Sequence, residues 1–180
     1  MPSELRFKKG LTPLGHLLIA SESEALVYAE FAETPEELLK KFQQQFTGRE
    51  SSESDDPFLQ RAWAAYCDYL TTPEALEAIP VTLNGTAFQR QVWEALEQMP
   101  LGSQNTYGAL AEAIGQPSAT RAVASACASN TIALRIPCHR ILRSDGALGG
   151  FRWGLAMKRR LLSSERRLRH NLQASDAATN

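Results

Sequence analysis

The 180-residue sequence contains little cysteine and no long apolar segment. Its three cysteines are Cys67, Cys127 and Cys138, and none of them lies in a CxxC motif. An odd number of isolated cysteines is neither a disulfide framework nor a zinc ribbon, which indicates reduced thiols in a cytoplasmic protein. No apolar run approaches the roughly 20 residues that cross a bilayer, so we expect no contact with a membrane.

Soft metal ligands are also scarce. The N-terminal part of the sequence offers only Cys67 and His16 as such ligands. Two ligands are too few for a closed tetrahedral zinc site. The sequence therefore predicts no metal, and we expect no other cofactor.

Charge is unevenly distributed along the sequence, although the formal net charge is only −1. Residues 1–117 contain 8 Lys and Arg against 17 Asp and Glu, whereas residues 118–170 contain 11 Lys and Arg against 2 acidic residues. Concentrated Lys and Arg favour contact with phosphates, so this C-terminal third is a candidate nucleic-acid surface. The same distribution is equally compatible with two parts of the chain that neutralise each other.

The sequence predicts an α/β (α+β) fold with two lobes. Residues 1–84 are expected to form an α/β lobe with a small antiparallel sheet. In that lobe, two apolar runs at 16–21 and 25–31, separated by polar residues, predict a β-hairpin. A helix start is expected at Thr34-Pro35, a loop over 48–56, and a second helix from Pro57 to about Leu70.

Residues 85–173 are expected to form a mostly helical domain, followed by a flexible tail at 174–180. A capping box at Thr86 begins its first helix. Two short helices at 107–114 and 118–129 follow, with Gly115 suited to a left-handed helix end and Ser118 to an N-cap. This pattern is typical of a helix-turn-helix, and an ordinary antiparallel helix pair is the alternative.

The second of these short helices is rich in alanine and serine, and Arg121 is its only long polar side chain. A helix that reads bases in the major groove needs several Arg, Asn or Gln side chains. A helix of small residues can instead approach a backbone or a minor groove closely. If this helix binds DNA, we expect little sequence preference, which argues against a transcription factor.

The most distinctive segment of the sequence is 135–142, in which Cys138 is followed by His139 and flanked by branched apolar residues. These residues predict a buried, extended strand, in which neighbouring side chains point to opposite faces. Proton transfer from Cys138 to His139 is then expected to pass through a water molecule. Nearby arginines favour the thiolate, which is the nucleophilic form. The alternative is an inert, buried cysteine beside a hydrogen-bonded histidine.

A carboxylate lies on the apolar side of the C-terminal helix. The apolar stripe of that helix is formed by Met157, Leu161 and Leu168, and Glu165 falls on it. Such a position is costly for a carboxylate without a partner. The candidate partners are His139, which would complete a Cys–water–His–Glu relay, and Arg166, Arg169 or another nearby arginine.

The Ile-Pro-Cys-His-Arg sequence at 136–140, preceded by Asn130 and followed by Gly-Gly-Phe-Arg-Trp-Gly at 149–154, resembles a known active-site segment. It is similar to that of the O6-alkylguanine-DNA alkyltransferases, or methylated-DNA–protein-cysteine methyltransferases, of bacterial type. The likeness covers about residues 86–167 in detail and the N-terminal lobe only in layout.

This resemblance implies a reaction in which Cys138 takes the alkyl group from O6 of guanine in DNA, once per molecule. His139 would act as the base through water, and Glu165 would orient it. Asn130 would hold the bend before the active-site segment. Tyr107 would contact the flipped guanine and help to protonate it.

The resemblance also implies how DNA is held. Arg121 would enter through the minor groove and fill the space left by the flipped nucleotide, whose extrusion costs a few kcal/mol of stacking. Further contacts with the DNA or the base are expected from Phe151, Arg140, Ser118, Ala119 and Thr120. Position 151 is Phe where many relatives carry Tyr, so a hydroxyl contact there is lost.

The expected partner is double-stranded DNA that contains O6-alkylguanine, with O4-alkylthymine as a second candidate substrate. We expect a monomer, able to assemble cooperatively on DNA, in the cytoplasm and associated with the nucleoid when bound. Two other classes of function remain open. One is a damage-binding module without chemistry, and the other is a thiol hydrolase that uses Cys138 and His139 over many turnovers.

Overall fold

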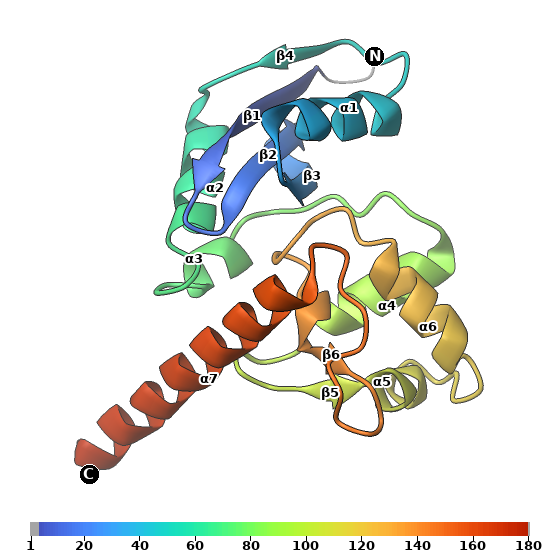
Figure 1. Ribbon diagram of the computed structural model, residues 1–180, viewed down its shortest axis with the longest axis vertical. Coiled ribbons are helices and arrows are strands. Elements are labelled where there is room, and N and C mark those ends of the chain that lie inside the picture. The colour runs from blue at the N-terminus through green and yellow to red at the C-terminus, as the bar shows by residue number, and fades with distance from the viewer. Residues whose placement is uncertain (1–3, 180) are drawn as a thin grey trace. The chain divides into compact units, whose positions relative to one another are not determined.

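The structure is a computed structural model in which residues 4–179 are described (Figure 1). Its contacts divide the chain into two compact units, Met1–Asn84 with Thr131–Arg135, and Gly85–Asn130 with Ile136–Asn180. Residues 131–135 therefore do not belong to the continuous second domain of residues 85–173 that the sequence predicts. They join the first unit because Ala29 N donates to Thr131 O at 2.8 Å and Ala133 N donates to Ala29 O at 2.9 Å.

The N-terminal unit is built on a four-stranded sheet in the order β3-β2-β1-β4. Its strands are β1 (Leu5–Thr12), β2 (Gly15–Glu22), β3 (Ala25–Ala32) and β4 (Ser51–Glu53). The predicted hairpin is present as the antiparallel pair β2–β3, whereas β4 pairs in parallel with β1. The prediction of loop throughout 48–56 is wrong for the three residues of β4.

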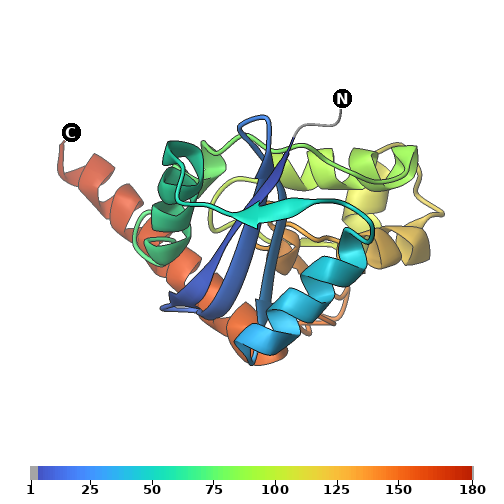
Figure 2. The same cartoon turned by 90° about the horizontal axis from the view of Figure 1, so that it is seen from above.

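Helices cover both faces of this sheet. They are α1 (Pro35–Gln45), α2 (Pro57–Cys67) and the short α3 (Glu74–Glu77). Thr34 caps α1 as expected, since its side chain accepts from Glu37 N. Leu38 and Phe42 of α1 pack in one core cluster with Leu18 and its neighbours. Figure 2 shows α1 and α2 on opposite sides of the sheet, so successive side chains of β2 and β3 are buried on both faces, whereas β4 is exposed.

The C-terminal unit is mostly helical, which confirms the α+β fold class. Its elements are α4 (Ala87–Glu97), β5 (Asn105–Thr106), α5 (Tyr107–Ala113), α6 (Thr120–Ala128), the 3-10 helix η1 (Cys138–Arg140), β6 (Ile141–Leu142) and α7 (Leu155–Ala178). The two short strands β5 and β6 pair in parallel. Helix α7 continues through residues 174–178, so the predicted flexible tail is helical there, and Asn180 lies outside the described residues.

Helices α4, α5 and α6 pack together in this unit. The capping box at Thr86 is present, and Trp93 Nε1 of α4 donates to Ala126 O of α6 at 2.9 Å. Gly115 has φ +76°, as the predicted left-handed helix end requires. The prediction that Ser118 caps α6 is wrong, because Ala119 is the N-cap residue and makes no side-chain capping bond.

The strand predicted over 135–142 is wrong at Cys138, although Ile141 and Leu142 do form strand β6. Residues 138–140 form one turn of 3-10 helix, with Arg140 N donating to Pro137 O at 3.0 Å. Apolar flanking residues indicated burial correctly, but burial does not distinguish a strand from a short helical turn.

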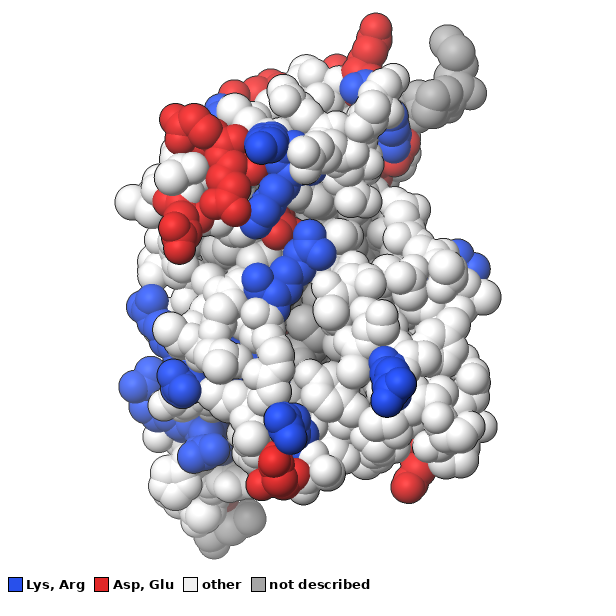
Figure 3. All heavy atoms as spheres, turned by 45° about the vertical axis from the view of Figure 1, so that its right-hand side comes forward, with Lys and Arg blue, Asp and Glu red and all other residues white. Residues whose placement is uncertain are grey.

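No helix within residues 4–179 is long and apolar enough to cross a membrane. Over the same residues, no three His, Cys, Asp or Glu side chains gather in a cluster that can hold a metal ion. Figure 3 shows that the Lys and Arg side chains on one face stand in several separate groups rather than in one continuous patch.

Candidate active site

Cys138 is buried at the start of η1, with 6% of its surface exposed. The amide of Asn130, which directly follows the C-cap of α6, reaches this residue. Its Nδ2 donates to Ile136 O at 2.9 Å and contacts Cys138 Sγ at 3.4 Å. One amide group thus fixes the backbone before the cysteine and supplies a hydrogen bond to its sulfur.

The surroundings of Cys138 act on its thiol in opposite directions. Burial raises the pKa of the Cys138 thiol, because a thiolate loses its hydration there. The hydrogen bond from Asn130 and the positive charges of Lys158 and Arg152 lower this pKa, with Asn130 the strongest of the three. The sulfur is therefore kept as a protonated thiol that a base has to activate.

His139 is fully buried and points to Glu165 of α7. Its Nε2 lies 2.6 Å from Oε1 of Glu165. Arg140 binds the same carboxylate, with Nε donating to Oε2 at 2.9 Å and Nη2 donating to Oε1 at 3.2 Å. Both candidate partners of Glu165 are thus present, and the arginine is Arg140. Arg169 instead donates to Gly102 O at 3.4 Å.

This arrangement determines the protonation of the buried groups. Burial by itself would raise the pKa of Glu165, but His139 and Arg140 hold the pKa of this carboxyl below its usual range. Burial lowers the pKa of His139 although the contact with Glu165 raises it, and the positive charges of Arg140 and Lys158 lower it further. An ionised carboxylate can only accept, so Nε2 of the neutral imidazole carries the proton and Nδ1 is the basic nitrogen.

A pocket of about 800 Å³ opens onto the sulfur. All its lining residues belong to the C-terminal unit, and they come from α5, α6, η1, the segment after β6 and the start of α7. Tyr107, Cys138 and Phe151 line it together, and the lining is mainly apolar. Burial is the main cause that raises the pKa of Tyr107, which keeps its phenol protonated.

The remaining predicted site residues lie elsewhere in this unit. Thr120 and Arg121 are exposed at the start of α6, and Ser118 is exposed just before it. Ala119 is half-buried, and none of these four residues lines the pocket. Arg140 is only 2% exposed, and its Nη1 also donates to Met99 O at 2.7 Å. The prediction that Arg140 contacts DNA is therefore wrong, because its guanidinium is used inside the protein.

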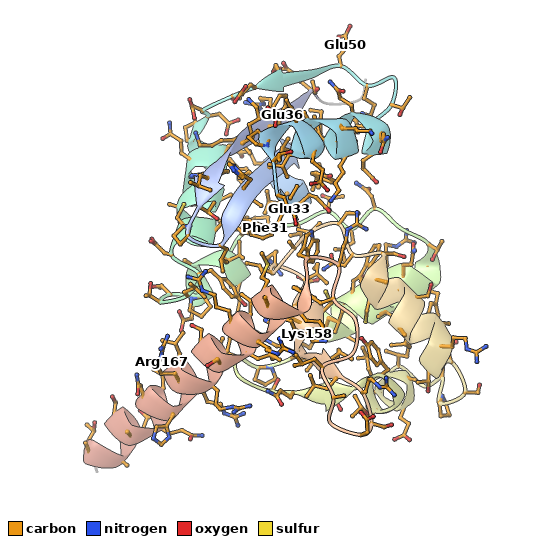
Figure 4. The ribbon with its side chains drawn as sticks, viewed as in Figure 1. Phe31, Glu33, Glu36, Glu50, Lys158 and Arg167 are labelled. Carbon is orange, nitrogen blue, oxygen red and sulfur yellow. The ribbon has the colours of Figure 1, made fainter. Side chains whose placement is uncertain are left out.

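The sequence prediction missed Lys158 of α7, which is fully buried (Figure 4). Its Nζ donates to Ile141 O at 2.6 Å, Leu148 O at 2.5 Å and Gly150 O at 3.2 Å. One signal was available, since Lys158 lies on the same helical stripe as Leu161 and Glu165. A lysine on an apolar stripe of a helix, like a carboxylate there, needs a partner that offsets the cost of burying its charge.

Comparison with known proteins points to one family. The sequence model described as "6-O-methylguanine DNA methyltransferase, DNA binding domain" matches residues 87–167. The chain is 42% identical over 154 residues to the "Bifunctional transcriptional activator/DNA repair enzyme Ada" of Escherichia coli, covering 84% of this chain and 43% of that protein. It is 38% identical to a "Methylated-DNA--protein-cysteine methyltransferase" of Haemophilus influenzae, covering 86% of this chain and 83% of that protein.

Solved structures are similar over most of the chain. A crystal structure of Mycobacterium tuberculosis OGT in complex with DNA has a TM-score of 0.73 at 29% identity, covering 89% of this chain and 92% of that one. The chain belongs to the family of methylated-DNA–protein-cysteine methyltransferases. It spans 43% and 42% of the length of its Escherichia coli and Salmonella typhimurium relatives, so it corresponds to only part of each.

Proposed function

We propose that this protein repairs DNA by transferring the alkyl group of O6-alkylguanine to its own Cys138, once per molecule. One observation carries the proposal: the thiol of Cys138 faces a pocket of about 800 Å³ and accepts a hydrogen bond from Asn130. That volume is in the range of small-molecule sites, which run from about 300 to 1,000 Å³. Family membership supports the same chemistry.

The thiol is activated by the adjacent histidine. In the proposed step, Cys138 loses its proton through a water molecule to Nδ1 of His139. Glu165 holds the opposite ring nitrogen and stabilises the imidazolium that forms. Asn130 stabilises the developing thiolate through its hydrogen bond.

The transfer itself is an in-line displacement at the alkyl carbon. The sulfur of Cys138 forms a bond with this carbon as the bond from the carbon to O6 breaks, and the electron pair goes to the guanine. Tyr107 supplies a proton to the departing guanine and regains one from solvent water, while the imidazolium of His139 returns its proton to solvent. The half-buried place of Tyr107 in the pocket wall supports this role. The product is a thioether, which is not readily reversed, so the protein is consumed.

A base inside a duplex cannot reach a buried sulfur, so the nucleotide has to be flipped into the pocket. We propose that α5 and α6 hold the duplex at its minor groove and that Arg121 fills the vacated space. Its exposure on a helix of small residues supports this role, with Ser118, Ala119 and Thr120 beside it. Phe151 would form a wall of the base site without the hydroxyl of a tyrosine.

The partner is then double-stranded DNA that contains O6-alkylguanine, and O4-alkylthymine is a second substrate of the same geometry. The proposed displacement needs no cofactor, since every group in it comes from the chain or the DNA. We further propose that the protein is a cytoplasmic monomer that joins the nucleoid when bound and can assemble cooperatively on DNA. Residues 85–173, apart from 131–135, would carry both DNA binding and alkyl acceptance.

The decisive experiment is mass spectrometry after mixing the protein with duplex DNA that carries one O6-methylguanine. We expect a gain of one methyl group on the Cys138 peptide, with no second addition. The Cys138→Ser variant should gain nothing, whereas the matched control Cys67→Ser should react as the unaltered protein does.

Two other results would overturn the proposal in different ways. Tight binding of the damaged duplex without any mass change would indicate a damage-binding module. Repeated turnover of an ester, with no lasting modification of Cys138, would indicate a thiol hydrolase.

A further inference from the structure

Lys158 is a buried cation without a carboxylate partner. Its relative exposure is 0%, and within residues 4–179 it forms no ion pair. A buried ammonium group is costly unless all its protons are hydrogen-bonded. Here three backbone carbonyls accept them, which are those of Ile141, Leu148 and Gly150. The number of acceptors matches the three donors of an ammonium group.

The three carbonyls belong to one segment of the chain. Ile141 lies in β6, where the segment leaves the active-site turn, and Leu148 and Gly150 lie seven and nine positions further on. Both of these later residues line the reactive pocket. Lys158 therefore joins the beginning of this segment to the part that forms the pocket wall.

The pocket wall is packed closely around this point. Gly149 lies between two of these residues with φ +70°, and a Cβ added there would lie 3.2 Å from Arg143 Cγ and 3.4 Å from Tyr107 Oη. The backbone at Gly149 thus lies close to the phenol of Tyr107, which supplies a proton in the proposed reaction. A small displacement of residues 148–150 would change the position of Tyr107 and the width of the base site.

We propose that Lys158 is a positioning residue, which ties residues 148–150 to Ile141 through three carbonyls so that the pocket keeps the shape needed for alkyl transfer. The inference rests on the proposed function, since it concerns the same pocket. Phe151 directly follows the last of the fixed residues and forms part of that wall. Its ring packs edge-on against Trp153, at 5.3 Å between centroids.

The charge of Lys158 has a second effect in the same place. Burial lowers the pKa of this lysine, and the neighbouring Cys138 and Cys127 raise it. Conversely, the ammonium group favours the Cys138 thiolate. Lys158 thus has two effects: its hydrogen bonds hold the pocket wall in place, and its charge favours the thiolate of Cys138. Different substitutions of Lys158 separate the two effects.

Two substitutions distinguish these effects. Lys158→Met keeps a long, unbranched side chain but removes both the hydrogen bonds and the charge. Lys158→Arg keeps the charge, although a planar guanidinium does not reproduce the three donor directions of an ammonium group. Lys40→Met, at an exposed position of α1, is the matched control for loss of a lysine.

The first measurement is hydrogen exchange of residues 143–151 in the absence of DNA. We expect exchange in Lys158→Met to be faster by about tenfold or more, because three hydrogen bonds that hold the segment are lost. Single-turnover methyl transfer from an O6-methylguanine duplex should then show a limiting rate lower by roughly 10- to 100-fold. Affinity for an undamaged duplex should stay unchanged, which a general loss of structure would not allow.

The Lys158→Arg variant tests whether the position of the N–H donors matters, since it keeps the charge but changes the donor geometry. We expect its exchange rate and limiting rate to lie between those of the unaltered protein and Lys158→Met. Full recovery of the rate by Lys158→Arg, with exchange still fast, would overturn the positioning role and leave only the charge effect.

The unaltered protein provides a test that does not depend on the folding of a variant. In protein labelled with ¹⁵N-lysine, the ammonium protons of Lys158 should exchange with water on the order of 100-fold more slowly than those of exposed lysines. Exchange as fast as that of exposed lysines would overturn the proposal. So would a folded Lys158→Met protein with unaltered exchange over 143–151 and an unaltered limiting rate.

These readouts separate the two proposals. If the unaltered protein transfers no methyl group, the proposed function fails, yet hydrogen exchange still tests whether Lys158 fixes the segment. If the unaltered protein transfers the group and Lys158→Met does so equally well, the positioning role alone fails.

Discussion

Nε2 of His139 lies 2.6 Å from Oε1 of Glu165, although the two residues are 26 positions apart in the sequence. Both side chains are buried, and Arg140 binds the same carboxylate. His139 and Arg140, which directly follow Cys138, therefore form one buried cluster with the carboxylate of Glu165.

Replacing Glu165 with Gln should destabilise the protein by about 3–5 kcal/mol, because Arg140 would be left as a buried charge without its partner. Methyl transfer should also slow by about 100-fold, since His139 would lose the group that orients it. Urea denaturation and single-turnover kinetics measure the two effects. Glu94→Gln, at an exposed position of α4, is the control and should change neither. Unaltered stability of Glu165→Gln would contradict the proposed cluster.

Stability should decrease as the pH falls, first through His139. Burial lowers the pKa of His139 in the folded protein below its usual value of 6.5, so protons bind preferentially to the unfolded chain. The stabilisation by neutral His139 is present above pH 6.5 and is lost as the pH falls towards the folded pKa. The free energy of unfolding lost through this one group is at most about 1.4 kcal/mol per pH unit.

The pKa of Glu165 is also lowered in the folded protein, so its contribution has the same sign. It is present above the usual pKa of 4.5 and is lost only below that value. Urea denaturation at pH 7.5, 6.5 and 5.5 isolates the histidine effect. In a His139→Gln variant, the loss of stability between pH 6.5 and 5.5 should become smaller. An equal loss in both proteins would indicate that other groups cause it.

Replacing Cys127 with Ala should leave methyl transfer within about twofold of the unaltered rate. Burial is the main cause that raises the pKa of Cys127 to about 12, so this thiol stays protonated and unreactive near neutral pH, although it lines the same pocket. Peptide mass spectra after reaction should contain methyl groups on Cys138 only. Methylation of Cys127 in a Cys138→Ser variant would contradict this assignment.

Replacing Arg121 with Ala should slow transfer from duplex DNA by about 10-fold or more and leave the stability of the protein unchanged. The side chain is exposed on α6, so its loss removes no internal packing. An inserted side chain has to offset a few kcal/mol of lost stacking when the nucleotide is flipped. The matched control is Arg90→Ala, at an exposed position of α4. An equal loss in the control would indicate a general charge effect.

Local patterns in the sequence were sufficient for much of the architecture. The hairpin of β2 and β3, the capped starts of α1 and α4 and the left-handed Gly115 each depend on neighbouring residues, whose preferences act over a few positions. The two short helices α5 and α6, on either side of Gly115, also follow from such signals. The same patterns failed at Cys138, because an apolar flank predicts burial but not whether the backbone is a strand or a helical turn.

For the site, the sequence by itself determined the chemistry available, since the residue types predict a relay of Cys138, His139 and Glu165, and the resemblance to the alkyltransferases adds Tyr107. Only the tertiary structure decided the partners. Glu165 binds both His139 and Arg140, which removes Arg140 from the DNA surface, and Lys158 turns inward to three carbonyls. The physical reason is that a buried charge requires partners in three dimensions, and residues far apart in the sequence supply them. Residue type limits what a side chain can do, and packing determines which groups it meets.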